Sequence, residues 1–278
     1  MESSTPPWPN LNRLSLLIST ILLAYTLTHF VSISVLQFNL SLLGIYFPIR
    51  INFTTLVTWL VAGLTASGTA WLLQSHPTIN QRVISTFGHW LLPSLTALVL
   101  MRSINLLNFG IAWWIAALGS GLLLVLVLSA EYIALDGSSP FYPLAEIAIT
   151  GVSIVLFLIL AISLHAAEAR LFYRVPILSL AALMVYTRVI NLRQPGKWAL
   201  TQASVSFLII GELAAGFHYW PIGSIVFGLV LTGPLYALVE VNDALPNQEH
   251  GLIPEGLLWP GLILILSWGG GFFLSTVS

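Results

Sequence analysis

Long uninterrupted apolar runs recur along this chain, and they constrain its fold more than any other feature. A helix needs about twenty apolar residues to cross the hydrocarbon core of a bilayer, and scanning at that width finds nine candidate spans. Apolar residues make up 57% of the 278 residues, whereas Asp, Glu, Lys and Arg make up only 7%. Because a soluble domain carries about 25% charged residues, this composition excludes a soluble enzyme, a nucleic-acid binder and a disordered chain.

The runs predict an all-α fold, a polytopic transmembrane helical bundle of eight or nine spans. A transmembrane β-barrel would alternate apolar and polar residues, whereas these runs are continuous. The spans leave only short connections, so residues 1–278 are expected to form a single transmembrane domain. The connection 37–50 is expected to lie along the membrane interface as an amphipathic segment. The predicted spans are residues 13–36, 51–74, 86–106, 109–132, 143–167, 175–192, 198–218, 221–241 and 256–276.

Two short patterns recur at the ends of the predicted spans. The sequence R-x-I-N-L ends a span at residues 102–106 and again at 188–192, and an aromatic-Pro-aliphatic step begins a span at 47–49, 142–144 and 220–222. Each element of the second pattern has a local explanation, since proline suits the first helical turn and aromatic side chains suit the membrane interface.

The order of these patterns along the chain predicts three units of three spans, at residues 11–107, 108–192 and 193–278. An odd number of spans per unit would place neighbouring units in opposite orientations, as in transporters with inverted repeats. The competing interpretation is chance recurrence in a chain dominated by a few apolar residue types, and the third unit lacks the Arg-Asn motif.

Ionisable residues inside the predicted spans are the main candidates for a functional site. A charged side chain near a helix centre costs about 2.5–3.5 kcal/mol on insertion scales, so such residues usually face protein or water and find partners. Asn105 and Asn191 follow Arg102 and Arg188 by three residues, which places each Asn on the face of its Arg. The candidate functional residues are Glu212, Arg102, Arg188, Glu131, Asn105 and Asn191.

Alignment of the proposed repeats predicts two ion pairs, Arg102 with Glu212 and Arg188 with Glu131. The alternative is that all four residues lie near span ends and extend to the headgroups. Glu212 is the best single candidate because apolar residues flank it on both sides. Its carboxyl group is expected to be either neutral through desolvation or ionised against a cation such as Arg102, and the alternative is a packing role.

Known catalytic motifs are missing from the sequence. It has no P-loop, no H-E-x-x-H and no G-x-S-x-G, and it contains no cysteine, so neither an enzyme nor a bound cofactor or metal is predicted. Its net charge of −1 gives no basic surface for nucleic acid. The expected partners are the lipid bilayer and other membrane subunits.

Residues 66–77, ASGTAWLLQSHP, resemble a segment of an uncharacterised bacterial family of polytopic integral membrane proteins. The resemblance implies a multi-pass protein of the bacterial inner membrane, and it implies no activity because the family has none assigned.

Three hypotheses for the function follow from the sequence. The first is a small transporter or carrier, based on the repeats and the intramembrane charges. The second is a non-catalytic subunit or assembly factor of a membrane complex. The third is a lipid-modifying enzyme, which no residue pattern in the sequence supports. A carrier should have a cavity at mid-depth lined by Glu212 or the arginines, whereas a subunit should present a flat apolar face.

Overall fold

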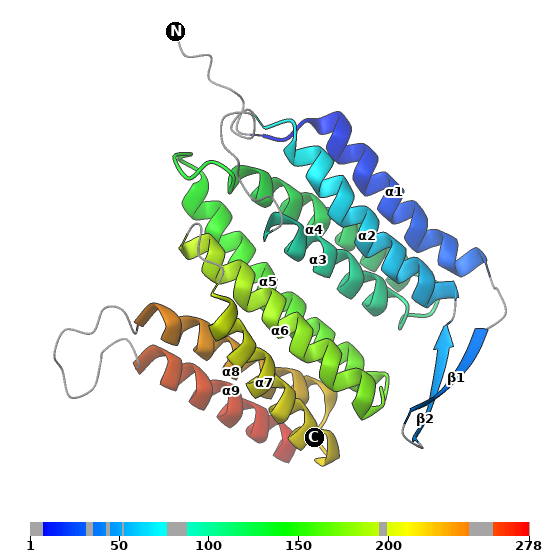
Figure 1. Cartoon of the computed structure of the whole chain (residues 1–278), viewed down its shortest axis with the longest axis vertical. Coiled ribbons are helices and arrows are strands. Elements are labelled where there is room, and N and C mark those ends of the chain that lie inside the picture. The colour runs from blue at the N-terminus through cyan, green and yellow to red at the C-terminus, as the bar shows by residue number, and fades with distance from the viewer. Residues whose placement is uncertain are drawn as a thin grey trace, which may run out of the picture. The chain divides into compact units, whose positions relative to one another are not determined.

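A computed structural model describes residues 8–31, 36–42, 45–51, 53–76, 88–194, 199–244 and 258–277. Nine α-helices lie within these described ranges, and each corresponds to one predicted span (Figure 1). The helical bundle predicted from the sequence is therefore confirmed. The helices are α1 Leu11–Phe30, α2 Phe53–Leu73, α3 Gly88–Ile104, α4 Ile111–Ile133, α5 Tyr142–Ala166, α6 Leu171–Arg193, α7 Leu200–Gly216, α8 Ser224–Ala244 and α9 Leu258–Val277, with a short 3-10 helix η2 at Phe217–Tyr219.

Seven of these helices are long and apolar enough to cross a membrane, as judged over the described residues, and they are α1, α2, α4, α5, α6, α7 together with η2, and α8. Apolar side chains also cover the outside of the molecule: Ile111, Leu122 and Ile265 are each more than 70% exposed. In lipid, a spanning segment must satisfy its backbone hydrogen bonds internally, which a helix does. The chain is therefore a multi-pass membrane protein.

A β-hairpin that the sequence analysis does not predict lies between α1 and α2 (Figure 1). Its strands β1 (Leu36–Leu42) and β2 (Ile45–Ile51) pair antiparallel, with Leu36 opposite Ile51 and Leu42 opposite Ile45. Each strand of a two-stranded sheet keeps one unpaired edge, which tolerates Pro48 within β2. The segment expected to be an amphipathic stretch is thus a hairpin, and its location at the membrane interface stays a prediction.

The chain divides into two compact units, unit 1 at Met1–Asp136 and unit 2 at Gly137–Ser278. In unit 1, helices α1 to α4 form a ring in which each helix packs against the next and α4 packs against α1. In unit 2, α5 to α8 form a ring in the same order, and α9 packs against α8. This division into two compact units does not test whether three groups of three helices are related by symmetry, so the three-unit repeat stays a prediction.

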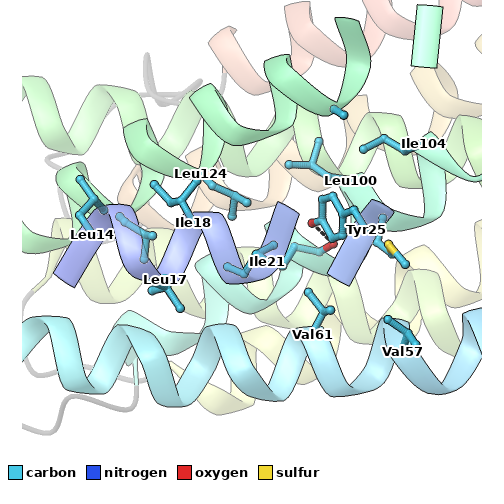
Figure 2. Close-up of a cluster of buried hydrophobic side chains, with 14 of the residues drawn as sticks. Leu14, Leu17, Ile18, Ile21, Tyr25, Val57, Val61, Leu100, Ile104 and Leu124 are labelled. Carbon is cyan, nitrogen blue, oxygen red and sulfur yellow. Dashed lines mark hydrogen bonds between the residues drawn. The ribbon is translucent and has the colours of Figure 1, made fainter. Parts of the chain in front are cut away.

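The core of unit 1 is built on one face of α1, as Figure 2 shows. Leu14, Ile18, Ile21 and Tyr25 recur three or four residues apart, which places their side chains in one stripe facing the other three helices. The Tyr25 hydroxyl group donates a 2.7 Å hydrogen bond to the carbonyl oxygen of Ala97. This bond satisfies the one polar group of the stripe and joins α1 to α3.

The aromatic-Pro steps occupy three different kinds of position. Pro143 lies in the first turn of α5, as predicted, and suits that turn because its missing N–H is not needed there. Pro48 instead lies inside strand β2, and Pro221 lies before the first residue of α8. The three steps therefore do not begin three equivalent helices, which removes part of the support for the predicted repeat.

Candidate functional site

A buried histidine–glutamate pair lies at one end of unit 1. The first turn of α3 carries His89 and the last turn of α4 carries Glu131, and the antiparallel packing of these two helices brings the side chains together. His89 Nδ1 lies 2.8 Å from Glu131 Oε2. Glu131 is 0% exposed and His89 is also buried. This pair places an ionisable carboxyl group in the protein interior, near the end of an apolar span.

The short contact between His89 and Glu131 requires a proton between the two atoms. Either the imidazole Nδ1–H donates to an ionised carboxylate, or a protonated carboxyl group donates to a bare Nδ1. The pair can therefore take up or release a proton while keeping its hydrogen bond. Histidine and carboxylate side chains in this relation form proton relays in membrane proteins.

The same end of unit 1 also contains a second histidine, His76, with the aromatic Tyr132 and the acidic Asp136 near it. His76 follows the last turn of α2, and its ring stacks edge-on at 4.6 Å against the ring of Tyr132 in α4. Burial lowers the pKa of His76, and the nearby charge of Asp136 partly offsets this effect. Among the described residues, no group of three His, Cys, Asp or Glu side chains could hold a metal ion.

The two R-x-I-N-L motifs have different environments. Arg188 is only 1% exposed, and its Nη1 donates to Asn191 Oδ1 at 3.4 Å, so this Arg and Asn share a face as predicted. Arg102 is half-buried and has no hydrogen bond or ion pair to the residues that the structure describes. Asn105 donates instead to the carbonyl oxygen of Met101 at 2.8 Å. The motif is therefore not one structural unit used twice.

Glu212 lies on the exposed face of α7 with Val205 and Leu208, which are 47% and 58% exposed. From its sequence neighbours, this carboxyl group is expected to be either neutral through desolvation or ionised against a nearby cation. The protein does not enclose it, and within the described ranges Glu212 forms no hydrogen bond or ion pair. The predicted pairs Arg102–Glu212 and Arg188–Glu131 each join a residue of unit 1 to one of unit 2, and they stay predictions.

From the sequence, Glu131 is a candidate residue with Arg188 as its predicted partner, and the pair with His89 is not predicted. Glu131 and His89 are 42 residues apart, and the signal that could have joined them is the alternation of helix direction. In two antiparallel neighbours, the first turn of one helix lies beside the last turn of the other. Both residues occupy such turns.

Unit 2 contains a groove of about 480 Å³, formed by one face of α5 together with the end of α6 and the middle of α8. Arg193 Nη2 lies 2.9 Å from Glu240 Oε1, and the Tyr236 hydroxyl group is hydrogen-bonded to both of these side chains. The residues lining the groove are Glu146, Ile147, Thr150, Gly151, Ile154, Val155, Arg193 and Tyr236. The groove thus has apolar walls and a few polar groups, which is typical of small-molecule sites.

A cluster of hydrogen-bonded polar side chains around Arg174 lies at one end of unit 2. The Arg174 side chain is buried, and its Nη1 lies 3.2 Å from His165 Nδ1 and 2.9 Å from His218 Nδ1. Because a guanidinium group can only donate, both Nδ1 atoms accept and neither is protonated. The Nε2–H of His165 then donates to the carbonyl oxygen of Ile222 at 3.1 Å. The cluster joins the end of α5, the start of α6, η2 and the segment before α8.

Comparisons with known proteins identify the family of this chain. A family model described as "Protein of unknown function (DUF5656)" matches residues 33–274, which include the segment 66–77. Neither the curated proteins nor the solved structures contain a match. The expected resemblance to an uncharacterised family is confirmed, and the chain belongs to the DUF5656 family of proteins of unknown function.

Proposed function

We propose that this protein is a small membrane carrier that uses the His89–Glu131 pair as a proton-binding site. The observation that carries the proposal is the complete burial of Glu131 in the last turn of an apolar span, at 2.8 Å from His89. Burying an ionisable group in a membrane costs several kcal/mol, and such groups mark ion and proton pathways by default. A purely structural contact between α3 and α4 would need no titratable pair.

Binding one proton to this pair changes the net charge of unit 1 by one. Moving an uncompensated charge through the hydrocarbon core is unfavourable, so a conformational step that carries the pair across would be favoured in its neutral form. Proton binding would thereby control the carrier's step. The candidate substrate site is the groove of unit 2.

The proposal includes three finer statements that rest on the sequence. We expect no enzymatic activity, because the chain carries no known catalytic motif. We expect the bacterial inner membrane as the location, because of the resemblance of residues 66–77. We retain an inverted repeat as a hypothesis supported by the R-x-I-N-L motifs, although those motifs differ in burial.

One observation favours the second candidate function, a subunit or assembly factor of a membrane complex. Glu212 is an exposed carboxyl group on the same helix face as Val205 and Leu208, with no ion pair to the described part of the chain. A basic residue on a neighbouring membrane protein would suit it. Under this alternative, Glu212→Lys should release co-purified subunits from native membranes solubilised in a mild detergent, whereas Glu131→Gln should not.

The carrier proposal is tested in proteoliposomes that contain a trapped pH-sensitive dye, with the membrane potential clamped by valinomycin and potassium. After an external acid step, vesicles with the wild-type protein should acidify faster than protein-free vesicles. Glu131→Gln should return the rate to that of protein-free vesicles, because Gln keeps the hydrogen bond but cannot exchange a proton. Circular dichroism confirms that the variant is folded.

Glu212→Gln is the matched variant, since it removes a carboxyl group that the protein does not enclose. It should acidify like the wild type. Loss of proton flux in Glu212→Gln with normal flux in Glu131→Gln would contradict the assignment to the His89–Glu131 pair and support the sequence-based candidate instead. Equal rates in wild-type and protein-free vesicles would favour the subunit hypothesis.

A further inference from the structure

We propose that the groove of unit 2 is a binding site for a small organic cation that carries an ammonium group. The proposal concerns equilibrium binding by unit 2, and it does not depend on proton exchange at His89 and Glu131. Three features of the groove carry it: its charge, its unpaired polar groups and its size.

One carboxyl group that lines the groove forms no ion pair with the residues that the structure describes. Arg193 is paired with Glu240 at 2.9 Å, and the Tyr236 hydroxyl group is hydrogen-bonded to both. Glu146 is half-buried at the groove and forms no hydrogen bond or ion pair within the described ranges. A bound monovalent cation would supply the ion pair that Glu146 lacks within these ranges.

A hydroxyl group one helical turn from Glu146 also lacks a partner. Thr150 follows Glu146 by four residues on α5, and both line the groove. The Thr150 Oγ1 atom is buried and has no hydrogen-bond partner among the described residues. Buried polar atoms are satisfied in the great majority of cases, so an unpaired one beside a groove points to a ligand group. An ammonium N–H can donate to the carboxylate and to the hydroxyl oxygen.

The size and walls of the groove select an organic cation over a metal ion. A Ca²⁺ ion takes six to eight oxygen ligands, whereas the groove offers one free carboxyl group and one free hydroxyl group. The volume of about 480 Å³ lies in the range that small organic ligands occupy. Ile147, Ile154 and Val155 supply an apolar wall that would bury the hydrocarbon part of the ligand.

Gly151 provides a way to fill the groove without disturbing the fold. It lies among the lining residues, and a Cβ atom added to it would meet no heavy atom within 4 Å. A leucine at this position would extend into the space of the groove. Gly119 on α4 is an exposed helical glycine that also has open space around its Cβ position, so Gly119→Leu controls for the general effect of replacing such a glycine.

The test is calorimetric titration of the full-length protein in detergent micelles with n-butylammonium, n-butanol and butyrate, against empty micelles. These probes share a hydrocarbon body and differ in the charge of the head group. The wild type should bind n-butylammonium, and its affinity for n-butanol and butyrate should be weaker by about tenfold or more. Equal binding of all three probes would overturn the proposal, because it would show nonspecific partitioning.

Two pairs of variants assign the binding to the groove. Glu146→Gln should weaken n-butylammonium binding by about tenfold or more, whereas Glu168→Gln, at an exposed carboxyl group outside the groove, should bind like the wild type. Gly151→Leu should abolish binding and Gly119→Leu should retain it, and this pair decides the question even if Glu146→Gln does not fold. Wild-type affinity in Gly151→Leu would overturn the proposal.

Discussion

Replacing His89 with phenylalanine should destabilise the protein far more than an exposed ion pair would suggest. The substitution keeps an aromatic ring at the start of α3 but removes the Nδ1 atom that lies 2.8 Å from Glu131 Oε2. Because Glu131 is 0% exposed, water cannot replace the lost hydrogen bond. Removing one partner of a buried charged pair costs about 3–5 kcal/mol, and of a neutral hydrogen-bonded pair about 1–3 kcal/mol. We expect a loss of about 3 kcal/mol.

A double-mutant cycle isolates the energy of this contact. Glu131→Leu alone and His89→Phe alone should each be destabilising, whereas the double variant should lose at least about 1.5 kcal/mol less than their sum. Arg193 and Glu240 are the matched control, because their side chains are 19% and 25% exposed. Their coupling should be about 1 kcal/mol or less, since partly exposed ion pairs contribute little.

The assay is reversible unfolding of the purified protein in mixed micelles, followed by tryptophan fluorescence and circular dichroism. Strict additivity of His89→Phe and Glu131→Leu would refute the reasoning, because it would show that the short contact contributes no coupling energy. A coupling for Arg193 and Glu240 as large as that for the buried pair would also contradict it.

Three further predictions follow from local features of the two units. Glu168 ends the turn after α5 with φ of +49°, in the left-handed region that favours glycine, so Glu168→Gly should stabilise the protein by about 1 kcal/mol in the same unfolding assay. Burial lowers the pKa of His76, so the neutral imidazole stabilises the fold above the ordinary histidine pKa, and this stabilisation is lost as the pH falls below that value. The melting temperature of the wild type should therefore decline more steeply on acidification than the melting temperature of His76→Phe. Parallel curves for the two proteins would contradict this prediction. A Cβ atom at Gly233 would collide with the side chain of Ser267, so Gly233→Val should cost about 1–3 kcal/mol by loosening α9, whereas Gly261→Val, with open space around it, should be nearly neutral in thermal unfolding.

The sequence predicts the helices well because the bilayer imposes their length. Each helix needs about twenty apolar residues, and a sequence scan detects such runs directly. The hairpin β1–β2 is missed because a scan for long apolar runs does not detect seven-residue strands, although β1, LQFNLSL, alternates apolar and polar residues as a strand does. Even α6, interrupted by Arg188, is correctly predicted, since one buried charge does not break a span.

The candidate site is harder to predict because it depends on which face of each helix is enclosed. When a helix is apolar all round, sequence periodicity does not identify its buried side. Glu212 and Glu131 have similar apolar neighbours in sequence, yet Glu212 is exposed on α7 and Glu131 is completely buried on α4. Only the packing of α3 against α4 distinguishes them, and that packing also supplies His89.

The most direct measurement of the central claim is infrared difference spectroscopy of the protein in lipid vesicles during a pH titration from about 8 to 5. Protonation of a buried carboxyl group produces a carbonyl stretching band that a carboxylate lacks. If the His89–Glu131 pair binds a proton on Glu131, the wild type should show such a band, Glu131→Gln should lack it, and His89→Phe should shift the pH at which it appears; if the proton is bound on His89, imidazolium ring bands should appear instead and be absent from His89→Phe. A carboxyl band that persists unchanged in Glu131→Gln, or a wild-type spectrum with neither kind of band, would contradict the assignment of this pair as a proton-binding site.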